Sequence, residues 1–182
     1  MIPELSSEHG LLPAGRYGAT RDEIHARFVH GRGERRTQLW NHWELATNLL
    51  GQHVPVNAVW LHGTFLSDAA QPQPVQCLYW VEDLELGKAR LDSVSGPLLR
   101  AFAMPGEVRR IVGVQVDTQL VPWHCQPDPQ DPDHYYAPYL QRRGMIDDLL
   151  QRVASGPAGA IRTRIDALPR RGYLEVIIDG YS

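Results

Sequence analysis

The Gly63-Thr64 pair, the neighbouring His62 and the later Asp117 are the residues of this sequence whose types suit chemistry on an anionic ligand. Gly63 and Thr64 follow an apolar run at 59–61, and because glycine lacks a Cβ atom, backbone amides there can approach an anion closely. His62 is of a type that acts as a base or a phosphate donor, although a partly exposed turn histidine is the commoner outcome. Asp117 alternates with valines at 112, 114 and 116, a pattern typical of a solvent-facing acid on a strand.

Two apolar runs that flank the Gly-Thr turn predict the strands that position it. Residues 56–61 and 75–81 are suited to central strands, and the polar segment 67–73 connects them. The alternation around Asp117 predicts another strand at 108–121, and a closing strand is predicted at 173–178. We therefore expect Gly63 and Gln76 to border one cleft, with Asp117 on a neighbouring strand that faces the same way.

Helical patterns lie between and around these strands. Thr20 and Glu23 form a predicted capping box at the start of a short helix. A longer helix is expected at 34–50, where apolar residues recur with helical spacing and Gly51 provides a stop. Further helices are predicted at 88–102, interrupted near the Gly96-Pro97 pair, and at 145–153 and 161–168. The order of elements indicates a single α+β domain over residues 1–182, with helices packed against a mixed sheet.

Composition limits the classes of partner. The 182 residues are 43% apolar and carry a formal net charge of −3, so charge does not indicate nucleic acid, and any site for a polyanion has to be local. Cys77 and Cys125 lack metal-ligand spacing and are expected to be buried free thiols. No apolar run reaches the length of a membrane span, and Glu4 and Glu8 stand where a signal peptide needs positive charge. The sequence thus predicts a soluble cytoplasmic protein without membrane contact.

Several segments, taken in order, resemble a small prokaryotic and phage branch of the minimal nucleotidyltransferases, which have the polymerase-beta-like fold. The resemblance covers most of the chain, and no single motif in it is specific. The matching residues are Leu12-Pro13-x-Gly15, Ala19-Thr20-x-Asp22-Glu23 with Arg27-Phe28, Arg35-Arg36, Trp60 to Phe65, Val116 to Pro122, and Pro169 to Tyr173. The resemblance implies a nucleotidyltransferase-like mixed β-sheet with helices packed against it.

The residues that the resemblance assigns to catalysis are only partly present. In that superfamily a Gly-Ser pair cradles the nucleotide phosphates, and Gly63 and Thr64 match it with threonine in place of serine. Asp117 matches the third metal-binding acid, whereas Pro74 and Gln76 occupy the positions of the two principal magnesium ligands. Two-metal phosphoryl chemistry needs several carboxylate oxygens, and neither proline nor glutamine supplies one. The implied fold and the implied activity therefore point in different directions.

Three functions remain open on this basis. The first is a catalytically degenerate nucleotidyltransferase-like protein that acts by binding and needs no cofactor, in a bacterial or phage toxin–antitoxin, immunity or defence role. The second is an active nucleotidyltransferase that uses magnesium and ATP, with Asp117 and an unconventional second acid such as Asp68; Glu82 and Asp83 lie too far along the chain to substitute. The third is a nucleotide-binding sensor that keeps the Gly63-Thr64 cradle without catalysis.

Two sets of side chains are possible binding residues outside this region. Tyr135, Tyr136 and Tyr139 follow a Pro/Asp-rich loop, and exposed tyrosines suit a surface for a protein partner or for self-association. The pairs Arg35-Arg36 and Arg109-Arg110 can cradle phosphate, but solvated surface charge is their expected role. Trp40, Trp43, Tyr79 and Trp80 are expected in the core.

Overall fold

The computed structural model describes residues 1–157 and 159–178, and these residues form an α+β fold built on a five-stranded mixed sheet. The strand order is β1-β5-β2-β3-β4. Strand β2 is antiparallel to both β3 and β5, whereas β1 pairs in parallel with β5 and β3 in parallel with β4. The strands are β1 (Gly15–Gly18), β2 (Ala58–His62), β3 (Val75–Glu82), β4 (Val116–Trp123) and β5 (Gly172–Ile177).

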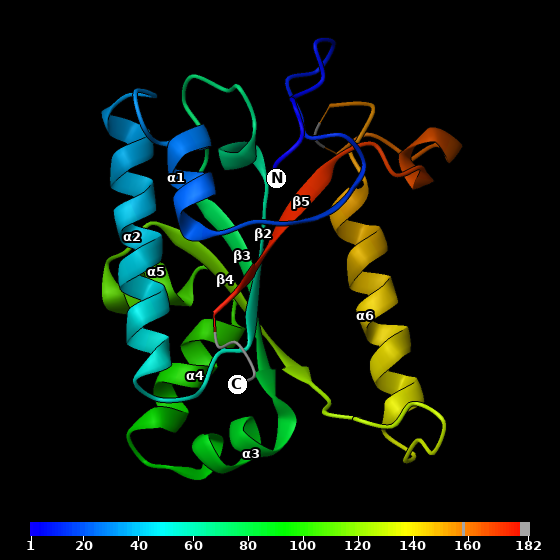
Figure 1. Cartoon of the computed structure of the whole chain (residues 1–182). Helices are drawn as coiled ribbons and strands as arrows, with labels where there is room; N and C mark the ends of the chain where they lie inside the picture. The colour runs from blue at the N-terminus through cyan, green and yellow to red at the C-terminus, as the bar shows by residue number, and fades with distance from the viewer. Residues whose placement is uncertain (158, 179–182) are drawn as a thin grey trace.

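Helices cover the two faces of the sheet unequally. Figure 1 shows α1, α2, α4 and α5 gathered on one side of the sheet and α6 alone on the other. The helices are α1 (Arg21–Phe28), α2 (Glu34–Gly51), α3 (Asp83–Leu91), α4 (Ser95–Ala103), α5 (Glu107–Val112) and α6 (Tyr136–Gln151), with short 3₁₀ segments η1 (Thr64–Leu66) and η2 (Arg164–Ala167). None of the helices in residues 1–157 and 159–178 combines the length and the apolar character needed to cross a bilayer.

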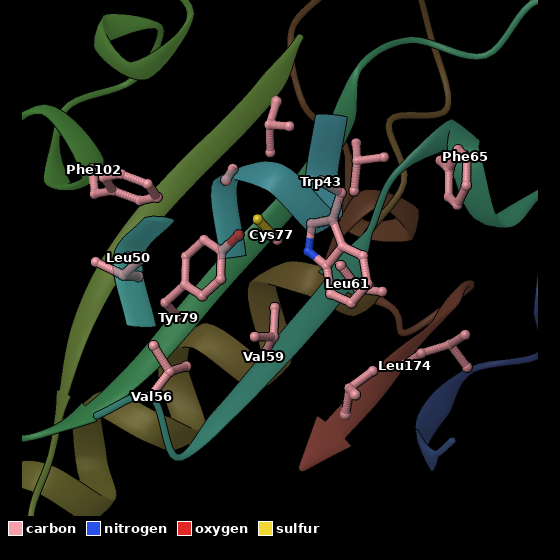
Figure 2. Packing of buried hydrophobic residues seen from close by; sticks show 14 of the residues in the cluster. Trp43, Leu50, Val56, Val59, Leu61, Phe65, Cys77, Tyr79, Phe102 and Leu174 are labelled. Atoms are coloured by element: carbon pink, nitrogen blue, oxygen red, sulfur yellow. The ribbon is translucent and has the colours of Figure 1, made fainter. Parts of the chain in front are cut away.

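The main core lies between the sheet and the four helices on its first face. Thr20 and Glu23 form the expected capping box, and α2 covers the predicted long helix. The predicted core aromatics Trp40, Trp43, Tyr79 and Trp80 are all buried. Because side chains alternate along a strand, β2 and β3 send every second residue into this core. Figure 2 shows part of it, including Trp43, Leu50, Val59, Leu61, Tyr79 and Phe102.

A smaller cluster fills the space between the second face of the sheet and α6. Trp60, Trp80 and Tyr173 form its aromatic part, with ring centroids 4.8 Å apart for Trp60 and Trp80 and 5.0 Å apart for Trp60 and Tyr173. Ile146 and Leu150 of α6 pack against these rings. This second face therefore carries both the aromatic cluster and, as described below, the residues at the ends of β2 and β3.

The region before Asp117 differs from the predicted strand at 108–121. Residues 107–112 form α5, which begins after Gly106 and ends at Gly113, and both glycines have a left-handed conformation with φ of 77° and 79°. Glycine adopts this conformation without a Cβ clash, so Gly113 ends the helix and the chain turns into β4 only at Val116. The alternating valines at 112, 114 and 116 thus extend from the last residue of α5 to the first residue of β4, and they do not belong to one strand.

Three other boundaries differ from the sequence prediction. The segment 88–102 contains two helices, and Gly96-Pro97 lies in the first turn of α4, where the missing N–H of proline costs nothing. Helix α6 begins nine residues before the predicted start at 145, and the predicted helix at 161–168 is reduced to the single turn η2. Strand β1 was not predicted, because its four residues have no apolar pattern and form a strand only by pairing with β5.

His124 ties the loop before α6 to the rest of the domain. Its Nδ1 lies 2.6 Å from an oxygen of Asp83 and its Nε2 lies 3.1 Å from the carboxylate of Asp133. Asp133 also accepts hydrogen bonds from the backbone N–H groups of Tyr135 and Tyr136 at the start of α6. An imidazole donates through both nitrogens only when protonated, and the hydrogen bond to Asp83, aided by Asp133, raises the pKa of His124.

We expect this arrangement to make stability depend on pH. The contribution of His124 is fully present below its ordinary pKa of about 6.5 and is lost as the pH rises through its raised folded-state value. Melting temperatures measured across neutral and mildly alkaline pH should fall more steeply for the wild type than for His124→Gln. His30→Gln, at an exposed histidine, serves as the control. An equal slope for wild type and His124→Gln would contradict the assignment.

Candidate functional site

The end of β2 and the starts of β3 and β4 bring His62, Gln76 and Asp117 into one row on the second face of the sheet. His62 is directly opposite Gln76, and Gln76 is directly opposite Asp117. Directly opposed residues project from the same face, so the predicted common orientation of Gln76 and Asp117 is confirmed. The three side chains line a pocket of about 430 Å³ together with Arg109 and Gly106 of the α5 region. We call this the Gln76–Asp117 pocket.

The Gly63 turn borders Gln76 closely. Gly63 has φ of 86°, and a Cβ atom there would lie 2.5 Å from Oε1 of Gln76. The turn therefore requires glycine for two reasons, its left-handed backbone and the close approach of Gln76. The amide of Gln76 fills the space on this side of Gly63, so a phosphate reaches the glycine from that side only if Gln76 rotates away.

The hydroxyl of Thr64 has a structural partner. Its Oγ1 accepts a hydrogen bond of 2.9 Å from the backbone N–H of Gln73, which closes the connector between β2 and β3. Pro74 follows directly, half-buried, immediately before β3. Thr64 thus holds the loop that leads to Pro74 and Gln76. The residue at the serine position of the resemblance therefore has a structural role in this loop.

Asp117 is paired with a cation of its own chain. Arg109 of α5 donates a hydrogen bond to Oδ1 of Asp117, and the two side chains form an ion pair that is 46% and 31% exposed, respectively. The exposed fraction means that the pair contributes little to stability, but it balances the carboxylate charge. Asp117 therefore faces a guanidinium at the position where the resemblance implies a metal ion.

No second acid joins Asp117 in the Gln76–Asp117 pocket, as lined by described residues. The backbone N–H of Asp68 donates to Gly10, and its carboxylate lies over that glycine. Asp83 bonds His124 at the far end of β3. Within the described part of the chain, no group of three or more His, Cys, Asp or Glu residues is placed to hold a metal ion.

His62 is partly exposed, as expected, but part of its ring is enclosed. It is the last residue of β2, and its Nδ1 is buried without a hydrogen-bond partner among the described residues. Burial, aided by the positive charge of Arg171, lowers the pKa of His62 to about 4. The imidazole is therefore neutral at physiological pH, and a base this weak is poorly matched to general base catalysis at neutral pH.

Arg36 is buried, contrary to the expected role of Arg35-Arg36 as solvated surface charge. Its guanidinium donates hydrogen bonds to the carbonyl oxygens of Phe28, Phe65, Ser67 and Ala69, at 2.7–3.2 Å. These carbonyls belong to the end of α1, to η1 and to the connector after the Gly-Thr turn. Arg36 therefore holds the turn in place from α2, a helix on the first face of the sheet. Its guanidinium is not available to a ligand.

The three tyrosines of the predicted partner surface have different environments. Tyr135 is 60% exposed and its ring lies 3.7 Å from that of His134, centroid to centroid. Tyr139 is half-buried, packs edge-on against Trp80, and accepts a hydrogen bond of 2.7 Å from Arg143. Tyr136 is also half-buried. Tyr135 is thus the tyrosine of this set that is openly accessible.

An aromatic pocket on the second face was not predicted from the sequence. Trp60, Trp80 and Trp123 line a space of about 230 Å³ together with Arg143 of α6 and Glu175 of β5. The Trp60 indole donates a hydrogen bond of 2.8 Å to Glu175, and Arg143 lies over the rings of Trp60 and Trp80. Trp60 shares a face of β2 with His62, and Trp80 shares a face of β3 with Leu78, because the residues of each pair are two positions apart. Only the pairing of β2 with β3 brings the two tryptophans together.

Comparison with known proteins gives one family. A model described as "Family of unknown function (DUF6932)" matches residues 3–162, which is most of the chain. Neither a curated protein nor a solved structure matches this sequence significantly.

Proposed function

The chain belongs to the DUF6932 family, whose function is unknown, and we propose from its geometry that it is a nucleotidyltransferase-like protein that acts by binding, without nucleotide transfer. The observation that carries the proposal is the row of His62, Gln76 and Asp117 beside the Gly63 turn. This row stands where the resemblance places the catalytic acids, and it presents a neutral imidazole, an amide and one carboxylate already paired with Arg109.

The same observation weighs against the two alternatives. An active enzyme needs a second acid beside Asp117, and the described residues that line the Gln76–Asp117 pocket supply none. A nucleotide sensor needs an open Gly63-Thr64 cradle, and there Gln76 lies over the glycine while Thr64 bonds the connector. By analogy with the implied branch, the binding role belongs to a bacterial or phage toxin–antitoxin, immunity or defence system.

Magnesium provides the test of this proposal. We expect millimolar magnesium, with or without ATP, to leave the melting temperature of the wild type unchanged, since residues 1–157 and 159–178 contain no cluster of carboxylates placed to bind it. The variant Pro74→Asp/Gln76→Asp restores two acids next to Asp117, and magnesium at 100 times its dissociation constant should stabilise it by about 2.7 kcal/mol. Thermal unfolding with and without EDTA measures both effects.

Two outcomes separate the proposal from its rival. The single variant Gln76→Asn, which adds no acid, is the matched control for the double variant and should not respond to magnesium. If the wild type itself is stabilised by magnesium and Asp117→Asn abolishes the effect, the metal site is intact and the proposal gives way to the metal-dependent enzyme. Nucleotide transfer from labelled ATP by the wild type would lead to the same conclusion.

We further propose that the loop before α6 presents the binding surface for a protein partner or a second copy of the chain. Tyr135 is exposed there and sits on a start of α6 that Asp133 caps and His124 anchors. A rigid aromatic side chain on an ordered helix start loses little conformational entropy on binding. Tyr139, in contrast, contributes to the packing of α6.

Replacing Tyr135 by serine should therefore weaken association while leaving the melting temperature unchanged. Tyr139→Ser removes an aromatic contact with Trp80 and should lower the stability without a specific effect on association. Association is measured by analytical ultracentrifugation for self-assembly and by co-purification for a partner. If Tyr135→Ser leaves association intact, or if it destabilises the fold as much as Tyr139→Ser, the surface lies elsewhere.

A further inference from the structure

The segment between the end of α6 and the start of β5 is strongly basic in an otherwise acidic protein. Residues 151–171 contain arginines at 152, 162, 164, 170 and 171 and one acid, Asp166, whereas the whole chain has a formal net charge of −3. Figure 1 shows the end of α6, η2 and the start of β5 side by side. Backbone hydrogen bonds from Arg170 and Arg171 to the carbonyl of Gln151 join the residues before β5 to the end of α6.

Three of these arginines surround one hollow, which we call the arginine pocket. Arg152, Arg162 and Arg171 line a space of about 500 Å³, together with Leu149, Thr163 and Asp166. Pockets of this volume accommodate small-molecule ligands. The pocket therefore combines a concave shape with three arginines, two from the ends of the segment and one from its middle.

The donors of this pocket are incompletely satisfied. Nε of Arg171 donates a hydrogen bond of 2.8 Å to the carbonyl of Leu150, and no carboxylate pairs with Arg171 among the described residues. Arg171 is partly buried, and this burial lowers the pKa of its guanidinium. Nε of Arg152 is buried and has no acceptor in the described part of the chain, although a terminal nitrogen of Arg152 lies 2.5 Å from Asp148.

The acid inside the pocket does not supply the missing acceptors. Asp166 accepts hydrogen bonds from the backbone N–H groups of Ser155 and Thr163 and from the Thr163 hydroxyl. Its two oxygens thus hold the loop, and these bonds keep the pKa of Asp166 well below its usual range. The C-terminal end of α6 offers partial negative charge to Arg171 through the hydrogen bond from Nε to the Leu150 carbonyl, and among the described residues no carboxylate neutralises that guanidinium.

We propose that the arginine pocket binds a phosphate group. Arg162 and Arg171 line the pocket without a carboxylate partner among the described residues, and an oxyanion that bridges guanidinium groups accepts several charge-assisted hydrogen bonds at once. Arginine is suited to this task because its planar fork matches the geometry of phosphate oxygens. The inference does not depend on the proposed function.

The two sources of such a group are a small phosphomonoester and the backbone of a nucleic acid. Isothermal titration with inorganic phosphate, a nucleoside 5′-monophosphate, and a single-stranded RNA lacking terminal phosphates distinguishes them. Binding of the phosphomonoesters identifies a small ligand, whereas binding of the RNA alone identifies a polymer. Either result supports phosphate recognition, and sodium chloride at matched ionic strength is the control for unspecific screening.

Arg162→Gln tests the pocket with little risk to the fold, because Arg162 is exposed and forms none of the hydrogen bonds that hold the segment. We expect it to weaken binding about tenfold, as the loss of one charge-assisted interaction does. Arg164→Gln removes the same charge from the same segment outside the pocket and should change binding less than about twofold. The proposal is overturned if none of the probes binds, if chloride competes equally well, or if Arg164→Gln weakens binding as much as Arg162→Gln.

Discussion

Replacing Arg36 by methionine is expected to lower the free energy of unfolding by about 3–5 kcal/mol, because several buried carbonyl oxygens are left without a donor at a cost of about 1–3 kcal/mol each. Arg36 is 3% exposed and donates to four carbonyl oxygens in three separate segments. Methionine fills much of the same volume but offers no donor, so these buried carbonyls lose their hydrogen bonds. The connector after Gly63 should then loosen first, because two of the four acceptors, Ser67 and Ala69, lie in it.

Arg35→Met is the matched control, since it removes the neighbouring arginine from the same helical turn. Arg35 is partly exposed and its guanidinium bonds the side chain of Gln115. Its loss should cost about 1 kcal/mol, the usual value for one hydrogen bond between side chains. Urea unfolding of the two variants measures the difference. Equal losses for Arg35→Met and Arg36→Met would show that the buried carbonyls find other partners.

Replacing Trp60 by alanine should destabilise the protein by about 3–5 kcal/mol, as expected for a large aromatic side chain in a well-packed site. Trp60 is 1% exposed and contacts Trp80, Tyr173 and the guanidinium groups of Arg16 and Arg143. Helix α6 packs on this cluster alone among the described core clusters. Its amide protons should therefore lose more protection from hydrogen exchange than those of α2, which packs on the first face.

Leu149→Ala separates packing on the cluster from effects on helix formation. Leu149 also belongs to α6 but is 60% exposed, so its truncation should change stability by less than about 0.5 kcal/mol. Hydrogen exchange followed by mass spectrometry, together with thermal unfolding, compares the two variants. Uniform loss of protection in α2 and α6 after Trp60→Ala would mean that the two faces of the sheet unfold as one unit and that α6 has no separate dependence on the cluster.

Together, the two predicted effects describe how the candidate site is supported. Arg36 holds the Gly-Thr turn from the first face of the sheet, and Trp60 lies on the second face, two residues before His62. The Gln76–Asp117 pocket lies on the second face, beside the end of the strand that carries Trp60. A binding role is compatible with such a rigid frame, because it needs a well-ordered surface and no movement of catalytic groups.

The sequence by itself determined those features that depend on neighbouring residues. The capping box of Thr20 and Glu23, helix α2, and the central strands β2 and β3 follow from local spacing and apolar runs, and each was predicted close to its observed position. The common face of Gln76 and Asp117 was also predicted. It follows from the two-residue alternation of strands once the strands are taken as neighbours.

Only the tertiary structure decided the features that arise from contacts between distant segments. Strand β1 has no apolar pattern and exists through its pairing with β5, about 155 residues later. Local sequence predicts a solvated Arg36 and a solvent-facing Asp117. In the structure, carbonyl oxygens of other elements accept hydrogen bonds from Arg36, and a guanidinium of another element pairs with Asp117. The arginine pocket likewise forms because α6 and β5 meet. Burial and charge pairing depend on the whole packed chain, and spacing along the sequence does not record them.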